Sequence, residues 1–147
     1  MKAIRVHKGQ SLIEVLIALG IGVLVIVALV QSLVTSVKNA SFAKNQNLAT
    51  RYSQEAVESI RSERDKLGWS TMNTNFNNKT FCLPTGDSAT WSQKVVSCAA
   101  ILGTIFVREA KFTSGGANTL LVEISTSWTD SSGTHTSKQN TYLTKWQ

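Results

Sequence analysis

The sequence contains few of the residues from which small secreted scaffolds and metal sites are built. Its 147 residues include two cysteines, two histidines and one proline. Two cysteines are too few for a disulfide-rich scaffold, and the separation of Cys82 from Cys98 matches no zinc or redox motif of the CxxC type. His7 and His135 leave little material for a histidine metal site. We therefore expect neither a metal nor a cofactor.

Catalytic motifs are also missing from the sequence. No GxSxG, HExxH, P-loop or GxGxxG pattern occurs in the chain. His135 lies in a polar segment beside a turn, and no GxSxG elbow in the chain provides a serine nucleophile that it could activate. We expect no catalytic residue and no enzymatic activity. The length is that of one folded domain with an appended segment.

Charge is absent from one long stretch near the N-terminus. Residues 15–37 are 23 residues without a charge, and as a helix they would measure about 34 Å against a hydrocarbon core of about 30 Å. The stretch is apolar on every face, which is typical of a lipid-embedded or fully buried helix. Residues 1–9 contain three Lys or Arg residues and no acid. The positive-inside rule therefore predicts a single-pass membrane protein whose basic N-terminal flank stays in the cytoplasm and whose part after Val37 lies on the far side.

Two other N-terminal segments have a similar composition. A secretory signal peptide also combines a basic start with an apolar run. Here the run is longer than usual, and no small-x-small cleavage site closes it. A plain single-pass anchor is the stronger alternative, because it explains both the basic residues and the apolar length.

A plain anchor does not explain Glu14, which lies at the start of the apolar run, five residues after Gly9. A lone carboxylate in hydrocarbon costs a few kcal/mol, so such residues usually have a partner and a function. Cleavage after Gly9 would give Gln10 a free α-ammonium group. That group could pair with a carboxylate at the depth of Glu14, in the same chain or in a neighbouring one.

The stretch from Lys8 to Leu19, KGQSLIEVLIAL, resembles the class III signal of type IV pilins and type II secretion pseudopilins. The resemblance implies cleavage after Gly9 by a prepilin peptidase, N-methylation of Gln10, and docking of the subunit through Glu14. Most members of the family have phenylalanine at the new N-terminus, so the glutamine here leaves methylation open. The implied partners are other pilin or pseudopilin subunits, the prepilin peptidase, the inner-membrane assembly platform, and membrane lipid before assembly.

The helix is expected to continue well beyond the apolar run. No proline occurs between Ser11 and Lys66, and Gly68 follows as a stop signal. An apolar stripe at helical spacing is formed by Ala49, Tyr52, Ala56 and Ile60. Charged pairs on the opposite side are Arg51 with Glu55, Arg61 with Asp65, and Glu58 with Arg61. We predict four regions: leader 1–9, membrane or filament-core helix 10–37, amphipathic helix 38–67, and a β-rich head 68–147.

The predicted head is rich in Ser, Thr, Asn and Gly. Alternation of apolar and polar residues from Leu120 to Trp128 predicts a half-buried strand. Strands over Thr104–Thr113 and His135–Thr144 flank it, and the polar last strand is expected at an edge. Asn73–Ser92 is expected to be an irregular connection. The predicted fold class is α+β: a long N-terminal helix whose second half packs against a small antiparallel sheet, as in pilins.

Two details of the sequence have alternative interpretations. Gly20 and Gly22 can ease close approach between membrane helices, or they can weaken the helix locally. Cys82 and Cys98 would close a loop of about 17 residues, and a bridge there would contribute about 3 kcal/mol. We expect a disulfide because the predicted compartment is oxidising, with two buried free thiols as the alternative.

We interpret the chain as a structural filament subunit, first in the inner membrane and then in a pilus or pseudopilus. The segment Ala49–Arg61 looks like the same region of minor pilins and minor pseudopilins, which favours an initiating or tip subunit. One alternative is a major pilin. Another is a non-polymerising membrane-anchored module that binds DNA or a secreted substrate.

The DNA alternative depends on the net charge of +6 and on four tryptophans, Trp69, Trp91, Trp128 and Trp146. Aromatic residues can stack on single-stranded bases, but in a small β-rich domain they more commonly form the core. Half of the net charge comes from the predicted leader. We therefore do not expect nucleic acid as a partner.

Overall fold

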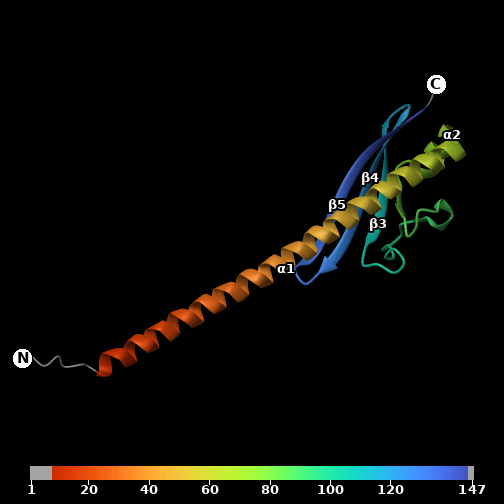
Figure 1. Ribbon diagram of the computed structural model, residues 1–147. Helices are drawn as coiled ribbons and strands as arrows, with labels where there is room; N and C mark the ends of the chain where they lie inside the picture. Colours follow the sequence, from red (N-terminus) through yellow and green to blue (C-terminus); the bar gives the residue numbers. More distant parts are fainter. Residues whose placement is uncertain (1–7, 146–147) are drawn as a thin grey trace, which may run out of the picture. The chain divides into compact units, whose positions relative to one another are not determined.

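The computed structural model describes the backbone of residues 8–145 and the side chains of residues 12–145. Helix α1 (Lys8–Leu67) is followed by α2 (Trp69–Phe76) and by five strands. The strands are β1 (Thr80–Cys82), β2 (Ser92–Gln93), β3 (Val107–Gly116), β4 (Thr119–Asp130) and β5 (Gly133–Thr144) (Figure 1). This is the predicted α+β class, with the arrangement of pilin-like folds.

The chain divides into two compact units, which meet in the sequence between Ala43 and Lys44. The first contains the apolar part of α1. The second, here called the globular unit, contains α1 from Lys44 onward together with α2 and the sheet.

Helix α1 ends where the sequence predicts. Gly68 adopts a φ of 74°, a left-handed conformation that favours glycine. Its N–H donates to the carbonyl oxygen of Arg64 at 2.9 Å, which satisfies one of the last helical carbonyl groups. Arg64 and Lys66 lie in the last turn, where cations interact favourably with the helix dipole.

All neighbouring strands pair antiparallel in the order β2-β1-β3-β4-β5. The alternation predicted for β4 is confirmed: Leu120, Val122, Ile124 and Trp128 are buried. The expected edge position of the last strand, β5, is also confirmed. The strand predicted over Thr104–Thr113 begins later, at Val107, because Ile101 to Thr104 form a turn closed by a 2.9 Å hydrogen bond from Thr104 N–H to Ile101 O.

The predicted irregular connection over Asn73–Ser92 is partly wrong. It contains the end of α2, strand β1 and a short 3-10 helix over Ser88–Thr90. Strand β1 has three residues and β2 has two. Segments this short show no measurable periodicity, so only their pairing with β3 and with each other reveals them.

The second half of α1 packs on one face of the sheet (Figure 1). The main core cluster joins Ala56, Val57 and Ile60 of α1 to buried residues of α2 and of strands β3, β4 and β5. In the predicted stripe Ala49, Ala56 and Ile60 are fully buried, whereas Tyr52 is half-buried. This burial, worth about 1.5–3 kcal/mol for each large aliphatic side chain, is what holds the helix on the sheet.

Cys82 and Cys98 form the expected disulfide. Their Cα atoms lie 5.3 Å apart, and the bond joins β1 to the long connection between β2 and β3. That connection is also held by Lys94, whose Nζ donates to both carboxylate oxygens of Glu109 at 2.8 Å.

Candidate docking helix and its carboxylate

The predicted processing site lies at the N-terminal limit of the described chain. The backbones of Gly9 and Gln10 belong to α1, and their side chains lie outside the described residues. Residues 1–7 of the predicted leader lie outside them as well. Cleavage after Gly9 and methylation of Gln10 therefore stay predictions.

Glu14 has a described, exposed side chain on an apolar helix surface. Ile13, Ile17, Ala18 and Ile21 line the same shallow hollow. Among residues 12–145, no cationic group lies within ion-pair distance of the Glu14 carboxylate. Glu14 is thus the only charged side chain among residues 12–37, and no cation among the described residues pairs with it.

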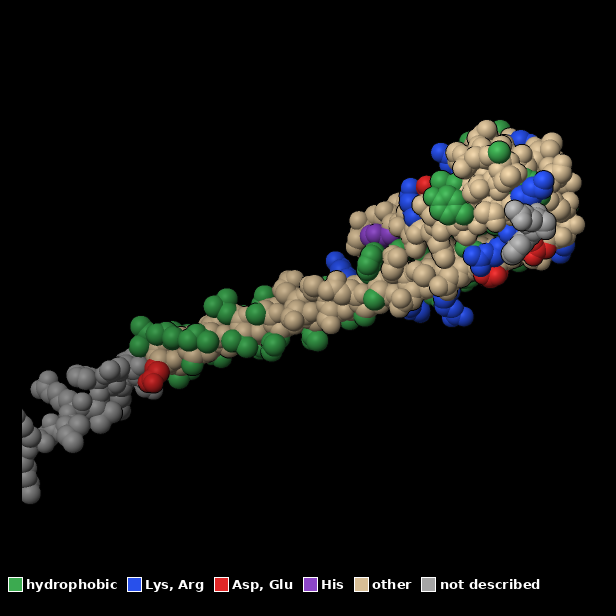
Figure 2. Space-filling model, turned by 90° about the horizontal axis from the view of Figure 1, so that it is seen from above, with side chains coloured by type: hydrophobic (Ala, Val, Ile, Leu, Met, Phe, Trp, Pro, Cys, Tyr) green, Lys and Arg blue, Asp and Glu red, His purple; other side chains and the backbone are tan. Residues whose placement is uncertain are grey.

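The apolar surface around Glu14 extends along the first unit. Every large aliphatic side chain from Leu12 to Val37 is between 47% and 70% exposed. Over an 18-residue window the mean hydropathy reaches 3.0, which is enough for a membrane-spanning helix. Figure 2 shows these hydrophobic side chains along the helix. A surface of this size must be covered by lipid or by other protein chains.

Gly20 and Gly22 have no packing role within the described chain. A Cβ atom added at Gly20 or Gly22 would meet nothing within 4 Å beyond the local helix backbone. Gly22 and Ala18, four residues apart, share a hollow with Val15 and Ile26. Small residues at this spacing allow close helix approach, whereas the cost of glycine in a helix interior supports the interpretation as a weak point.

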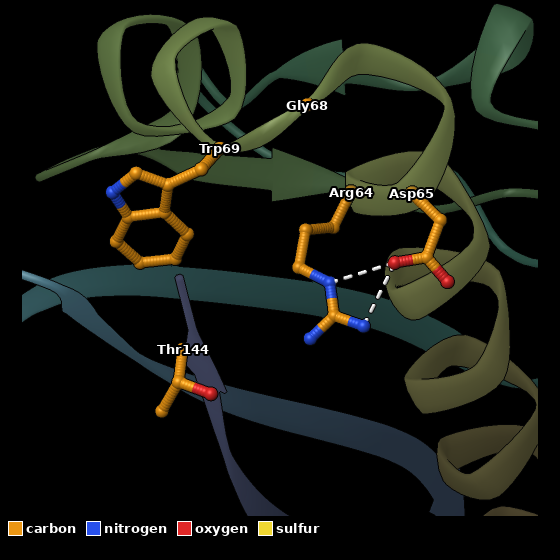
Figure 3. A pocket seen from close by; sticks show the side chains of 5 residues that line it. All are labelled: Arg64, Asp65, Gly68, Trp69 and Thr144. Carbon is orange, nitrogen blue, oxygen red and sulfur yellow. Dashed lines mark hydrogen bonds and ion pairs between the residues drawn. The ribbon is translucent and has the colours of Figure 1, made fainter. Parts of the chain in front are cut away.

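A third hollow, in the globular unit, shows no chemistry of its own. It is lined by Arg64, Asp65, Gly68, Trp69 and Thr144 (Figure 3). Arg64 donates from Nε and Nη2 to Oδ1 of Asp65 at 2.9 and 2.8 Å, so its charge is already paired. Within the part of the chain that the structure describes, no group of three metal-ligating side chains occurs.

The three tryptophans that the structure describes do not form a stacking surface. Trp128 is 1% exposed and packs against Phe106, with 5.8 Å between ring centroids. Trp69 and Trp91 are half-buried against the main core cluster. Trp146 lies outside the described residues. The three described tryptophans thus contribute to the core, as the sequence indicates.

The pairing of charges on α1 agrees only partly with the predicted pairs. Arg61 donates to Glu58 at 2.8 Å, as expected. Asp65 accepts from Arg64 instead of Arg61. Glu55 lies 3.5 Å from Arg108 of β3 and not in an ion pair with Arg51.

Arg108 is a central residue that the sequence reasoning missed. Its side chain is buried, with Nε donating to Leu83 O at 3.0 Å and Nη1 to Tyr52 O at 2.8 Å. Burial lowers the pKa of this guanidinium, and Glu55 acts in the opposite direction. The available signal was its position on the same face of β3 as Ala110 and Phe112, which predicts burial.

Comparison of the chain with protein-family models, with characterised proteins and with solved structures finds no match. The functional conclusion therefore depends on the residues and geometry of the chain itself.

Proposed function

We propose that this protein is a structural subunit of a type IV pilus-like filament or a type II secretion pseudopilus. The proposal rests on one observation: Glu14 is a carboxylate without a described partner, on a helical segment, residues 12–37, whose large aliphatic side chains are all exposed. An anchor alone would need the aliphatic surface but not the carboxylate. A subunit that docks against other helices needs both.

The proposed sequence of events begins in the inner membrane, with the globular unit outside the cytoplasm. A prepilin peptidase cleaves after Gly9 and leaves the α-ammonium of Gln10 at the head of the helix. In the filament this charge pairs with Glu14 of the same or a neighbouring subunit. In a low-dielectric environment a charge that lacks its partner costs several kcal/mol, so the subunit is stable only at the position where the two charges meet. Glu14 thereby sets the depth at which a new subunit stops.

The resemblance of Ala49–Arg61 to minor subunits supports a low-abundance initiating or tip position, with a major subunit as the alternative. A membrane-anchored binding module that never polymerises would need no docking carboxylate. In the described residues of the globular unit no group of three metal-ligating side chains occurs, and Arg64, which lines one of its hollows, is already paired with Asp65.

The Glu14→Gln variant tests the docking role directly. It keeps the shape of the side chain and removes its charge, so membrane insertion should be unchanged. Incorporation into filaments should fall roughly tenfold or more, because the Gln10 ammonium would lose its partner. The readout is the ratio of this protein in sheared filaments to that in the membrane fraction.

Glu58→Gln is the matched control, because Glu58 lies on the same helix but in the globular unit, exposed and paired with Arg61. Its filament ratio should equal that of the unaltered protein. Equal ratios for Glu14→Gln and Glu58→Gln would show that Glu14 has no docking role.

A further inference from the structure

Strand β5 forms one edge of the sheet, and its outer side has no neighbouring strand in the described chain. Its 12 residues pair with β4 without a register shift, from Gly133 opposite Asp130 to Thr144 opposite Thr119. Among residues 12–145, no hydrogen bond from another segment reaches the outer side of β5. A row of unpaired backbone N–H and C=O groups on such an edge is a template for pairing with another chain.

The backbone groups that face outward belong to every second residue of β5. In an antiparallel ladder, pairs that exchange hydrogen bonds alternate with pairs that do not. Directly after the strand, the N–H of Lys145 donates to the carbonyl oxygen of Asn118 at 3.0 Å. The odd-numbered residues therefore bond to β4, and the even-numbered residues turn their N–H and C=O groups away from it. The outward residues, whose side chains are all exposed, are Thr134, Thr136, Lys138, Asn140, Tyr142 and Thr144.

The features by which proteins block strand addition are missing from this edge. Such features are short edge strands, proline, bulges and charged side chains. Strand β2 at the opposite edge has two residues, whereas β5 has 12 and contains no proline and no bulge. Its one lysine, Lys138, donates to Glu123 of β4 at 2.9 Å, so its charge is paired within the sheet. Strand β5 is thus long, regular and open.

The chemistry of the edge specifies an extended polypeptide as its occupant. Outward N–H and C=O groups recur every two residues, about 6.8 Å apart, and an extended chain presents the matching repeat. Five of the outward residues are Thr, Tyr or Asn, and β-branched and aromatic side chains form favourable cross-strand pairs. Residues 131–147 include two lysines and no acid. An uncharged or acidic segment therefore fits this edge better than a basic one.

Gln139, in the middle of β5, provides an independent observation. Its Oε1 atom is buried and has no hydrogen-bond partner among the described residues. A buried polar atom without a partner costs free energy. A strand added to the outer edge would place Gln139 in a pair without backbone hydrogen bonds, where opposite side chains lie closest. A side-chain donor at that position of the added strand would supply the missing bond.

We propose that β5 binds an extended segment of a neighbouring filament subunit, which continues the sheet beyond its present edge. The proposal rests on the function proposed above, which supplies the neighbouring chain. The bound segment is uncharged or acidic and has a hydrogen-bond donor opposite Gln139. Main-chain hydrogen bonds then join two globular units, in addition to the contacts between the apolar helices.

Hydrogen exchange tests the proposal, because strand addition protects alternate backbone amides. The full chain is compared in purified filaments and after extraction into detergent, with exchange resolved to single residues. We expect the even-numbered amides of residues 136–142 to exchange about tenfold or more slowly in the filaments. The odd-numbered amides of the same stretch bond to β4 in both states and are the internal control.

Two other results of this measurement contradict the proposal in different ways. Even-numbered amides that exchange at the same rate in both states, with the protein present in the filaments, would overturn the inference and leave the proposed function standing. Absence of the protein from the filaments would overturn the proposed function and the inference with it.

Thr136→Pro blocks the outer edge at one position. The N–H of Thr136 faces away from β4, so proline removes an outward donor and no bond of the ladder, as edge strands tolerate. Thr136→Ala is the matched control, because it removes the same side chain and keeps the N–H. We expect the ratio of protein in filaments to that in the membrane fraction to fall several-fold for the proline variant alone. Equal ratios for two folded variants would contradict strand addition, and the exchange pattern of the unaltered chain decides if the proline variant does not fold.

Discussion

Arg108 connects three parts of the globular unit through one side chain. It bonds to carbonyl oxygens in α1 and in the segment after β1, and it lies 3.5 Å from Glu55. Its Nη2 atom has no hydrogen-bond partner among the described residues. The two hydrogen bonds therefore offset part of the free-energy cost of burying the guanidinium, and they fix the position of α1 against β3.

We expect Arg108→Met to lower the free energy of unfolding by about 2 kcal/mol, because two hydrogen bonds from a charged donor are lost while the aliphatic stem is kept. Arg51→Met is the matched control, since Arg51 is exposed on the same helix as Glu55. It should change stability by less than about 0.5 kcal/mol. Urea unfolding followed by tryptophan fluorescence measures both, and equal effects would contradict the role given to Arg108.

Asp130 gives the fold a dependence on acidic pH. The backbone N–H of Ser132, and after it the imidazole of His135 at 3.1 Å, lower the pKa of the Asp130 carboxyl. A depressed folded-state pKa stabilises the fold above the unfolded value of about 3.9, and this contribution is lost as the pH falls through the folded pKa. An NMR titration of this carboxyl should give a midpoint below about 3.9. A midpoint at or above that value would contradict the assignment.

Individual side-chain partners were only partly predictable from the sequence. Glu58 and Arg61 pair as expected because both are exposed on one helix face. Glu55 instead turns toward Arg108, a residue 53 positions away in the numbering, which helix spacing cannot reveal. The 2.8 Å hydrogen bond between the buried Ser53 and Thr126 could not be predicted for the same reason, because Thr126 belongs to the sheet.

At the scale of elements, long periodic segments were predictable and short ones were not. The composition of residues 11–66 is sufficient to predict α1, and the alternation along β4 is sufficient to predict its buried face. Strands β1 and β2 are defined by their partners, since they contain only three and two residues. The conformation of the β2–β3 connection also depends on tertiary contacts, because the Cys82–Cys98 disulfide ties it to β1.

The Cys82–Cys98 disulfide should contribute about 3 kcal/mol to the stability of the globular unit, because a crosslink restricts the conformational freedom of the unfolded chain. Reduction should lower the urea midpoint accordingly, measured on the full chain in detergent by near-UV circular dichroism. A double variant, Cys82→Ala with Cys98→Ala, should show the lower midpoint with or without reductant. An unchanged midpoint on reduction of the native protein would mean that the bond adds no stability.

At the scale of the whole molecule, the charge has a different meaning from the one suggested by its total. The 15 Lys and Arg residues include three in residues 1–9, so a chain starting at Gln10 would carry 15 − 3 = 12 bases against 9 acids. Its side-chain charge would be +3 instead of +6. Half of the basic excess thus belongs to a predicted topology signal, and two bases of the described head, Lys94 and Lys138, are paired with acids.

The fold class could be predicted from the sequence more fully than the function, and the two units differ in the reason. Helix length and strand alternation follow from hydrophobic periodicity, which a single sequence contains. The neighbours of the exposed helix belong to other chains or to lipid, and the sequence states only that such neighbours must exist. Among residues 12–37, Glu14 is the one charged residue, so it alone bears on whether the neighbours are lipid or other chains.

Quantitative mass spectrometry of purified filaments, from the cells that make this protein, tests directly whether the chain is a processed filament subunit. We expect an N-terminal peptide that begins at Gln10, in an amount well below that of the major subunit. A chain that keeps Met1 and remains in the membrane fraction, with none in the filaments, would contradict it.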